Sequence, residues 1–119
     1  MAESEETKFE VIFTTSARLF FYELLDYLFN FYSFTRVEQI SLELIDLALK
    51  LSHLYDRGTP EPELISRSNK YRYLLYNRTR KKDIKIIYYV DYQLRHVYVT
   101  DFFPTEMDNK KISRRSESK

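Results

Sequence analysis

Basic side chains gather in one stretch of this sequence, between two runs rich in aromatic residues. The stretch from Tyr71 to Asp91 reads YRYLLYNRTRKKDIKIIYYVD. Its candidate anion-binding or nucleic-acid-binding residues are Arg72, Arg78, Arg80, Lys81, Lys82 and Lys85. Such an excess of positive charge attracts phosphate backbones or an acidic protein segment, but a solvated hairpin tip gives the same pattern. Both interpretations stay open at this point.

Charge is divided unevenly along the 119 residues, although the formal net charge is only +1. Residues 1–66 carry twelve acids against five bases, and residues 67–119 carry fourteen bases against six acids. The second half is therefore the half suited to an anionic partner.

The composition removes several kinds of chemistry. The chain has no cysteine, which excludes disulfides, thiolate zinc sites and cysteine nucleophiles. Its two histidines, His53 and His96, fit surface or packing roles better than catalysis, and no set of His, Asp and Glu has convincing metal-ligand spacing. We expect neither a metal nor a cofactor.

Location is predicted from the start of the chain and from its longest apolar run. The opening MAESEETK is acidic, whereas a secretory signal is basic and then apolar. The apolar run Leu19–Phe34 is interrupted by polar residues and is too short to span a bilayer. These features predict a cytoplasmic protein with no membrane partner.

The elements that must position the basic residues begin with a short strand and two helices. The run Phe9–Phe13 leads to Thr14, Thr15 and Ser16, which suit a helix N-cap. A second helix is predicted to open at Thr35, which has capping-box spacing to Glu38, and to run through Leu54. A turn of two or three residues joins the helices. Gly58 is predicted to be a left-handed cap, with Pro60 blocking continuation.

Three strand-like runs follow, with Tyr, Ile and Val content and hairpin-length connections: Lys70–Tyr76, Ile84–Asp91 and His96–Phe103. The order β-α-α-β-β-β predicts an α+β fold, with a helical hairpin packed on a mainly antiparallel four-stranded sheet. The domain is predicted to cover residues 8–106. Residues 1–7 and the polar tail 107–119 have the composition of disordered ends.

Strand alternation predicts which side chains share a face. Arg72, Leu74 and Tyr76 would lie on one side of their strand, and Lys85, Ile87 and Tyr89 on one side of the next. The opposite sides are apolar or aromatic and suit the helix-covered face. Arg72 and Lys85 would then flank a phosphate on the open face, or be ordinary solvent-side residues.

The layout resembles the RelE/ParE superfamily of toxins from type II toxin-antitoxin modules, the plasmid stabilisation type, over residues 8–112. The resemblance is carried by the strand leading to TTSA, the helical hairpin, the YR of YRYLLY, the run IKIIYYVD and the closing VYVTDFFPTE. It implies an antitoxin as hetero-oligomeric partner. It also implies growth inhibition, either by binding DNA gyrase or by ribosome-dependent mRNA cleavage.

When the catalytic positions of the ribonuclease members are matched to this sequence, the site is incomplete. The chain keeps Arg72 and Lys85, but Leu74 stands where a further Lys occurs, and Glu106 follows the last strand where many relatives have Arg or His. If the chain is an endoribonuclease, Arg72 and Lys85 would stabilise the phosphate, and Tyr89 or Glu106 would move protons. The departures favour a ParE-like binding toxin, with a RelE-like ribonuclease and an inactive toxin-like binding protein as alternatives.

The first helix is predicted to need an outside cover. Its polar stripe is narrow, so Phe20, Tyr27, Phe31 and Phe34 would leave apolar area facing water. These four are the candidate partner-binding residues. The cover would be an antitoxin, a second copy of the chain in a homodimer, or the chain's own second helix and sheet.

Overall fold

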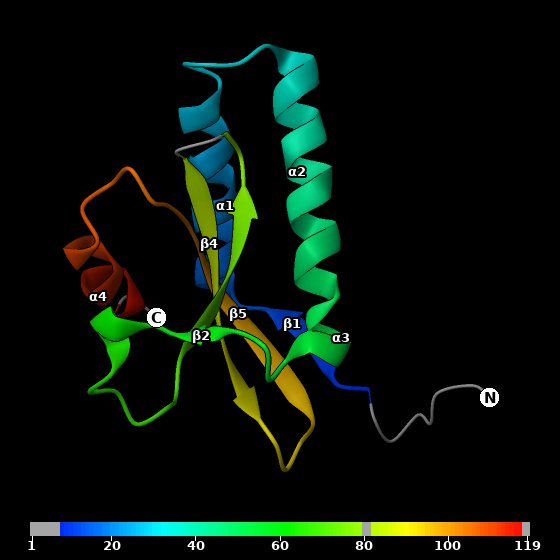
Figure 1. The fold of residues 1–119 in the computed structure, drawn as a ribbon, viewed down its shortest axis with the longest axis vertical. Coiled ribbons are helices and arrows are strands. Elements are labelled where there is room, and N and C mark those ends of the chain that lie inside the picture. Colours follow the sequence, from blue (N-terminus) through cyan, green and yellow to red (C-terminus); the bar gives the residue numbers. More distant parts are fainter. Residues whose placement is uncertain (1–7, 80–81, 118–119) are drawn as a thin grey trace.

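The computed structural model of the chain describes residues 8–79 and 82–117 (Figure 1). Its strands are β1 (Glu10–Phe13), β2 (Thr59–Pro60), β3 (Arg72–Asn77), β4 (Asp83–Asp91) and β5 (His96–Pro104). Its helices are α1 (Thr15–Leu28), α2 (Phe34–Leu49), α3 (Leu51–Leu54), the 3₁₀ helix η2 (Pro62–Leu64) and α4 (Lys110–Glu117). The α+β class is as predicted.

The sheet has five strands in the order β1-β5-β4-β3-β2. β1 runs parallel to β5, and the other neighbours are antiparallel. The prediction of four strands was therefore one short. The missed strand, β2, has two residues and lies in the Pro-rich link, where proline restricts pairing to a sheet edge.

The two long helices form as predicted, but the cap of the second differs. The Thr14 hydroxyl accepts a hydrogen bond from the Ala17 amide at 3.1 Å, which caps α1. Ser33 caps α2, because its hydroxyl accepts from the Arg36 amide at 3.2 Å. The prediction that Thr35 opens this helix was wrong. The connection spans residues 29–33, longer than expected, and the helical path breaks at Lys50 into α2 and α3.

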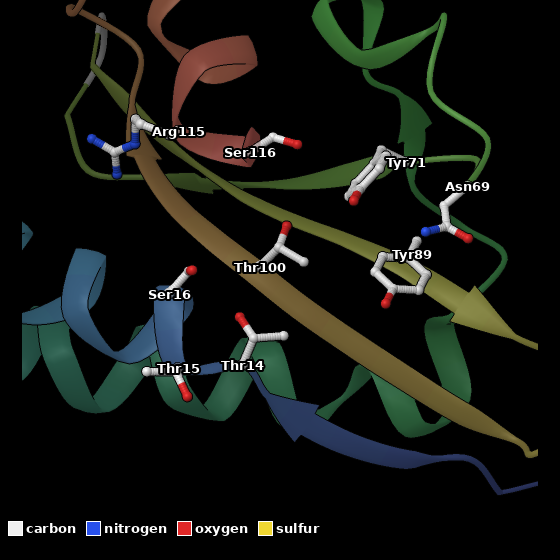
Figure 2. Close-up of a pocket in the computed structure, with 9 residues that line it drawn as sticks. All are labelled: Thr14, Thr15, Ser16, Asn69, Tyr71, Tyr89, Thr100, Arg115 and Ser116. Carbon is white, nitrogen blue, oxygen red and sulfur yellow. The ribbon is translucent and has the colours of Figure 1, made fainter. Parts of the chain in front are cut away.

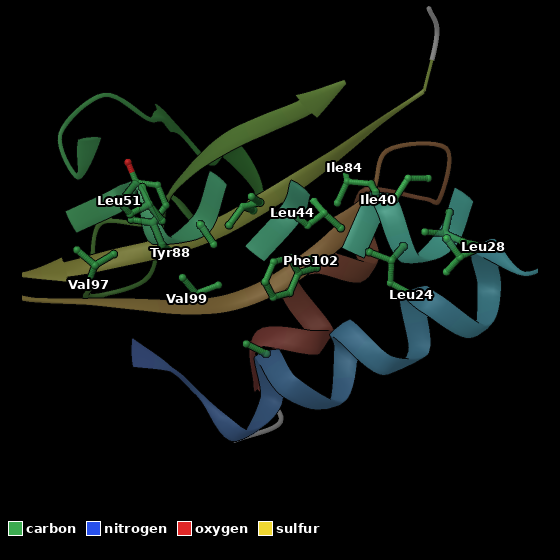
Figure 3. Close-up of a cluster of buried hydrophobic side chains, with 14 of the residues drawn as sticks. Leu24, Leu28, Ile40, Leu44, Leu51, Ile84, Tyr88, Val97, Val99 and Phe102 are labelled. Atoms are coloured by element: carbon green, nitrogen blue, oxygen red, sulfur yellow. The ribbon is translucent and has the colours of Figure 1, made fainter. Parts of the chain in front are cut away.

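The main core lies between the helical hairpin and one face of the sheet (Figure 3). Leu24, Leu28, Ile40 and Leu44 project from the helices toward the sheet. Strands β4 and β5 meet them with side chains that are almost fully buried: Ile84, Ile86, Tyr88, Val97, Val99 and Phe102.

A second, smaller core covers the opposite face of the sheet. Ile87 of β4 and Phe103 of β5 pack with Leu64 of η2 and Ile112 of α4, and all four are buried. Residues 107–119 were predicted to be a disordered tail. Within that tail residues 110–117 form α4, whose single apolar side chain, Ile112, anchors it to the sheet. The residues 1–7 also predicted to be disordered lie outside the described part of the chain.

Gly58 is required by a close approach and not by its backbone angles. No described glycine has a positive φ, so the predicted left-handed cap was wrong. The ring of Tyr88 lies against Gly58 instead, and a Cβ at position 58 would fall 2.9 Å from the Tyr88 Cε1 and Cζ atoms. The Tyr88 hydroxyl accepts from the Gly58 amide at 3.0 Å and donates to the Tyr55 carbonyl at 2.9 Å.

We therefore predict that Gly58→Ala lowers the free energy of unfolding by about 1–3 kcal/mol, because the added methyl group displaces a buried ring. Urea unfolding followed by circular dichroism measures the loss. The loss should be smaller when Gly58→Ala is introduced into a Tyr88→Phe background. That background lacks the Tyr88 hydroxyl oxygen, which is the atom nearest to the added methyl group. An equal loss in both backgrounds would show that contact with Tyr88 is not the cause.

Candidate functional site

The structure separates the two cations that were predicted to share one face. Arg72 is directly opposite Tyr88 in the β3–β4 ladder, so its side chain lies on the helix-covered side. There its Nη1 atom donates to the Gly58 carbonyl at 2.8 Å. Lys85 is opposite Leu75 and lies on the other side. The predicted phosphate cradle between Arg72 and Lys85 is therefore wrong.

The error came from the faces assigned to β3. Leu74 and Tyr76 pack in the main core, whereas Tyr71 and Tyr73 pack against the second core. Both sides of this strand carry apolar or aromatic groups because both faces of the sheet are covered. Alternation alone could not decide which side meets the helices.

Lys85 is paired inside the protein. Its Nζ atom lies 2.8 Å from Oε1 of Glu61, whose side chain is fully buried, and 4.4 Å from the centre of the Tyr73 ring. The other Glu61 oxygen accepts from the Glu63 amide at 3.0 Å. Lys85 is thus neutralised by a residue that the sequence did not single out. Glu61 lies between two prolines, and the neighbouring sequence does not indicate that its side chain is buried against Lys85.

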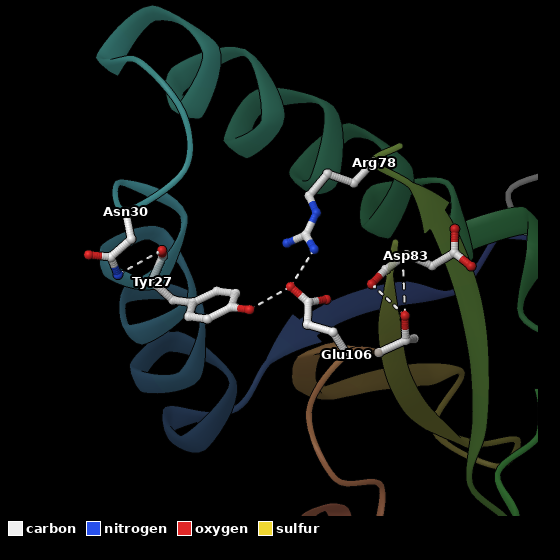
Figure 4. Close-up of polar contacts among 6 residues, drawn as sticks. Tyr27, Asn30, Arg78, Asp83 and Glu106 are labelled. Atoms are coloured by element: carbon white, nitrogen blue, oxygen red, sulfur yellow. Dashed lines mark hydrogen bonds and ion pairs between the residues drawn. The ribbon is translucent and has the colours of Figure 1, made fainter. Parts of the chain in front are cut away.

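Glu106 contacts neither Arg72 nor Lys85. It lies near the α1–α2 turn and bonds to Tyr27 and Arg78 (Figure 4). One of its oxygens accepts from the Tyr27 hydroxyl at 2.6 Å and from Arg78 Nη2 at 2.5 Å. Burial opposes ionisation of this carboxyl, but the hydrogen bonds from Arg78 and Tyr27 outweigh it and lower the pKa of Glu106. Burial, followed by the bond to Glu106, raises the pKa of Tyr27 to about 12.

The four candidate catalytic residues are therefore not assembled into one site. Arg72 lies on one face of the sheet, and Glu106 is held by Arg78 and Tyr27. Lys85 and Tyr89 share a face but are four residues apart on one strand, about 13 Å along it. A single phosphate could not contact both side chains and Glu106 as they stand.

The predicted basic cluster is also dispersed. The Arg78 side chain is buried, and its Nε and Nη1 atoms have no hydrogen-bond partner in the described part of the chain. Lys82 lies over the Phe31 ring, 5.3 Å from its centre. Arg80 and Lys81 lie outside the described residues.

A pocket of about 260 Å³ lies on the face of the sheet opposite the helical hairpin (Figure 2). Of the predicted site residues that the structure describes, only Tyr89 lines it, and its ring contacts Tyr71 with centroids 5.2 Å apart. The remaining lining residues are mostly hydroxyl or amide side chains: Thr14, Thr15, Ser16, Asn69, Thr100, Arg115 and Ser116. No carboxylate or histidine is among the lining residues, so the pocket has aromatic and hydroxyl surfaces but no general acid–base pair.

Arg115 is the residue of this pocket that sequence reasoning missed. It forms two bonds to Asp101, with Nε–Oδ2 at 3.0 Å and Nη2–Oδ1 at 2.5 Å, and it stacks 3.9 Å from the centre of the Phe20 ring. Burial raises the pKa of Asp101, and Arg115 offsets part of that effect. Arg115 was overlooked because α4 contains only one apolar residue, too few for a helical pattern.

The four predicted partner-binding aromatics divide into two pairs. Phe20 lies under Arg115 and Tyr27 is bonded to Glu106, so both are half-buried by the chain itself. Phe31 and Phe34 are 54% and 68% exposed, as predicted, but their placement on the first helix was wrong: α1 ends at Leu28, Phe31 lies in the connection and Phe34 begins α2.

A second hollow, an apolar groove of about 350 Å³, lies between α1 and α2. It is lined by Phe13, Arg18, Phe21, Tyr22, Ile45 and Phe102. Arg18 is its only charged lining residue. Exposed Leu42 and Leu49 lie on the same side of α2 as Ile45, since residues three and four apart share a helix face. No local sequence pattern could predict this groove, because it depends on the separation of two helices.

Other kinds of site find no support in the described residues. They contain no cluster of three or more His, Asp or Glu side chains placed to hold a metal ion. Across residues 8–79 and 82–117, no helix has both the length and the apolar character needed to cross a membrane. Comparisons with protein-family models, with curated proteins and with solved structures found no match.

The contacts of Glu106 predict a dependence of stability on pH. Because its pKa lies below the ordinary value of 4.5, the carboxylate stabilises the folded protein above that pH, and this contribution is lost as the pH falls through the lowered pKa. We expect Glu106→Gln to lower the free energy of unfolding by about 2 kcal/mol at neutral pH, since it leaves Arg78 buried without its carboxylate.

Urea unfolding of both proteins over a pH series measures this difference. It should shrink as the pH falls below 4.5. Glu38→Gln is the matched control, because Glu38 is exposed and should show no such dependence. A difference between wild type and Glu106→Gln that stays constant with pH would contradict the assignment.

Proposed function

We propose that this chain is the toxin component of a type II toxin-antitoxin module and acts, like the ParE members, by binding its target. The observation that carries the proposal is the apolar groove between α1 and α2. Tyr22 on its rim is 65% exposed, and Leu42 and Leu49 extend the apolar surface along α2. Exposed apolar residues gathered beside a groove are typical of a protein-binding surface.

The apolar lining of the groove, with Arg18 at its edge, suits an amphipathic helix from a partner protein. A helix laid between α1 and α2 would place apolar residues at i, i+3, i+4 and i+7 against Phe21, Ile45 and Phe102. Arg18 at the edge would select an acidic residue on that helix. These features suit the segment of an antitoxin that neutralises the toxin in a hetero-oligomer.

The arrangement of the contacts supports binding over RNA cleavage. The cations that a ribonuclease would use are engaged with groups of the same chain, Arg72 with the Gly58 carbonyl and Lys85 with Glu61. Tyr89 has no acid or histidine beside it in its pocket. DNA gyrase is therefore the first target to test, and the ribosome with its mRNA is the second.

The arrangement of strands and helices adds support of a weaker kind. A first strand beside the last one, a helical hairpin on one face and three consecutive antiparallel strands are the features expected of a RelE/ParE-like domain. A cytoplasmic location follows from the same proposal, since gyrase and the ribosome are both in the cytoplasm.

Expression of the chain alone in bacteria should slow growth without cutting mRNA at ribosomal A sites, because the candidate catalytic residues are not brought together in the described part of the chain. Growth curves with mapping of RNA 5′ ends after induction measure both effects. Codon-phased cuts that disappear in Lys85→Ala would support the ribonuclease alternative. Normal growth with abundant folded protein would count against any toxin.

Under this proposal we expect a small antitoxin gene beside this one. Co-expression of that antitoxin should relieve the growth defect, and Tyr22→Asp should abolish the relief by placing a charge on the groove rim. Tyr22 is largely exposed, so the fold should survive the change. Leu94→Asp, at an exposed position on the β4–β5 turn, is the matched control and should still be relieved. Equal relief of both variants would show that the partner binds elsewhere.

A further inference from the structure

The turn between α1 and α2 presents aromatic rings to solvent. Residues 29–34 read FNFYSF, which is four aromatic residues in six and no charged one. Phe29, Phe31 and Phe34 are 45%, 54% and 68% exposed. The Phe29 and Phe34 rings stack with centroids 6.1 Å apart, and Phe31 packs edge-on against Tyr27 at 5.1 Å. The rings are thus held in an exposed arrangement by one another and by α1.

This turn stands at one end of the long axis of the molecule, away from the β4–β5 turn at the other end (Figure 1). It is separate from the groove, because Tyr22 precedes Phe29 by seven residues, about 10 Å along a helix. A cation from the neighbouring β3–β4 connection joins it, since Lys82 lies over the Phe31 ring. Exposed Asp26 lies in the last turn of α1. Arg36 and exposed Glu38 lie near the start of α2.

The three rings by themselves expose less area than one side of a stable protein interface. A phenylalanine side chain buries roughly 200 Å² at most, so the three exposed fractions amount to roughly 300 Å². A stable protein complex buries about 800 Å² on each partner. A convex group of rings beside a lysine is instead suited to the boundary between lipid headgroups and acyl chains, where aromatic residues are favoured and cations meet anionic lipids.

We propose that the α1–α2 turn inserts into the surface of an anionic lipid bilayer, with Phe29, Phe31 and Phe34 entering the headgroup region and Lys82 contacting lipid phosphates. This contact is peripheral and needs no membrane-spanning helix. It is independent of the toxin proposal, because vesicle binding by the purified chain succeeds or fails whatever the chain inhibits.

The chain has no tryptophan, which allows a site-specific probe. Phe31→Trp places a single indole on the turn, and Tyr92→Trp places one at an exposed position of the β4–β5 turn as a matched control. With vesicles of phosphatidylcholine and phosphatidylglycerol in equal parts, the emission of Phe31→Trp should shift to the blue and be quenched by brominated acyl chains. The emission of Tyr92→Trp should not change.

Co-sedimentation of the full chain with the same vesicles gives a second measurement. Wild type should sediment with them and much less with phosphatidylcholine alone, and Phe31→Ser with Phe34→Ser should lose most of this binding while keeping the wild-type circular dichroism. Lys82→Gln should weaken binding to the anionic vesicles. No binding to either vesicle would overturn the proposal, as would equal blue shifts at positions 31 and 92. Loss of self-association instead of vesicle binding in the double variant would assign the turn to a second copy of the chain.

Discussion

Burial of β4 on both sides is the constraint on which the rest of the structure depends. This strand is central in the sheet, and its residues Ile84 to Tyr88 are all buried. One side meets the helical hairpin, so it needs Ile84, Ile86 and Tyr88. The other side meets η2 and α4, so it needs Ile87. A sheet covered on both faces needs strands that are mostly apolar on both sides, and β4 and β5 have that character apart from a few polar residues such as Lys85 and Asp101.

Charged groups that enter such a sheet need partners, and the chain supplies them from its connections. Lys85 points into the second core and is met by Glu61, which precedes η2. Asp101 of β5 is met by Arg115 of α4. An isolated charge in these positions would strongly favour unfolding. The two pairs therefore hold the segment around η2 and the helix α4 against the sheet. The pairing with Glu61 also removes from solvent the charge of Lys85, which was a candidate catalytic residue.

The sequence predicted the elements better than their faces. β1, both long helices and the three long strands could be found from apolar periodicity and caps, because each signal is local. The faces of β3 could not, because its two sides are equally apolar. α4 could not be predicted either, since its stability comes from contacts with Asp101, Phe20 and the second core and not from its own composition.

The candidate site follows the same division. Exposure of Phe31 and Phe34 was predictable, because the run from Leu19 to Phe34 has more apolar residues than one packing surface can cover, although neither residue lies on α1. The groove between α1 and α2 and the pocket beside Tyr89 depend on distances between elements far apart in the chain, which no local pattern records. The central strands are packed on both sides, and the two surfaces proposed to bind partners lie on or beside the helical hairpin. The groove, which Phe13 and Phe102 of the sheet help to line, is proposed to bind a helix, and the turn is proposed to contact a bilayer, so one small domain would present two different kinds of contact.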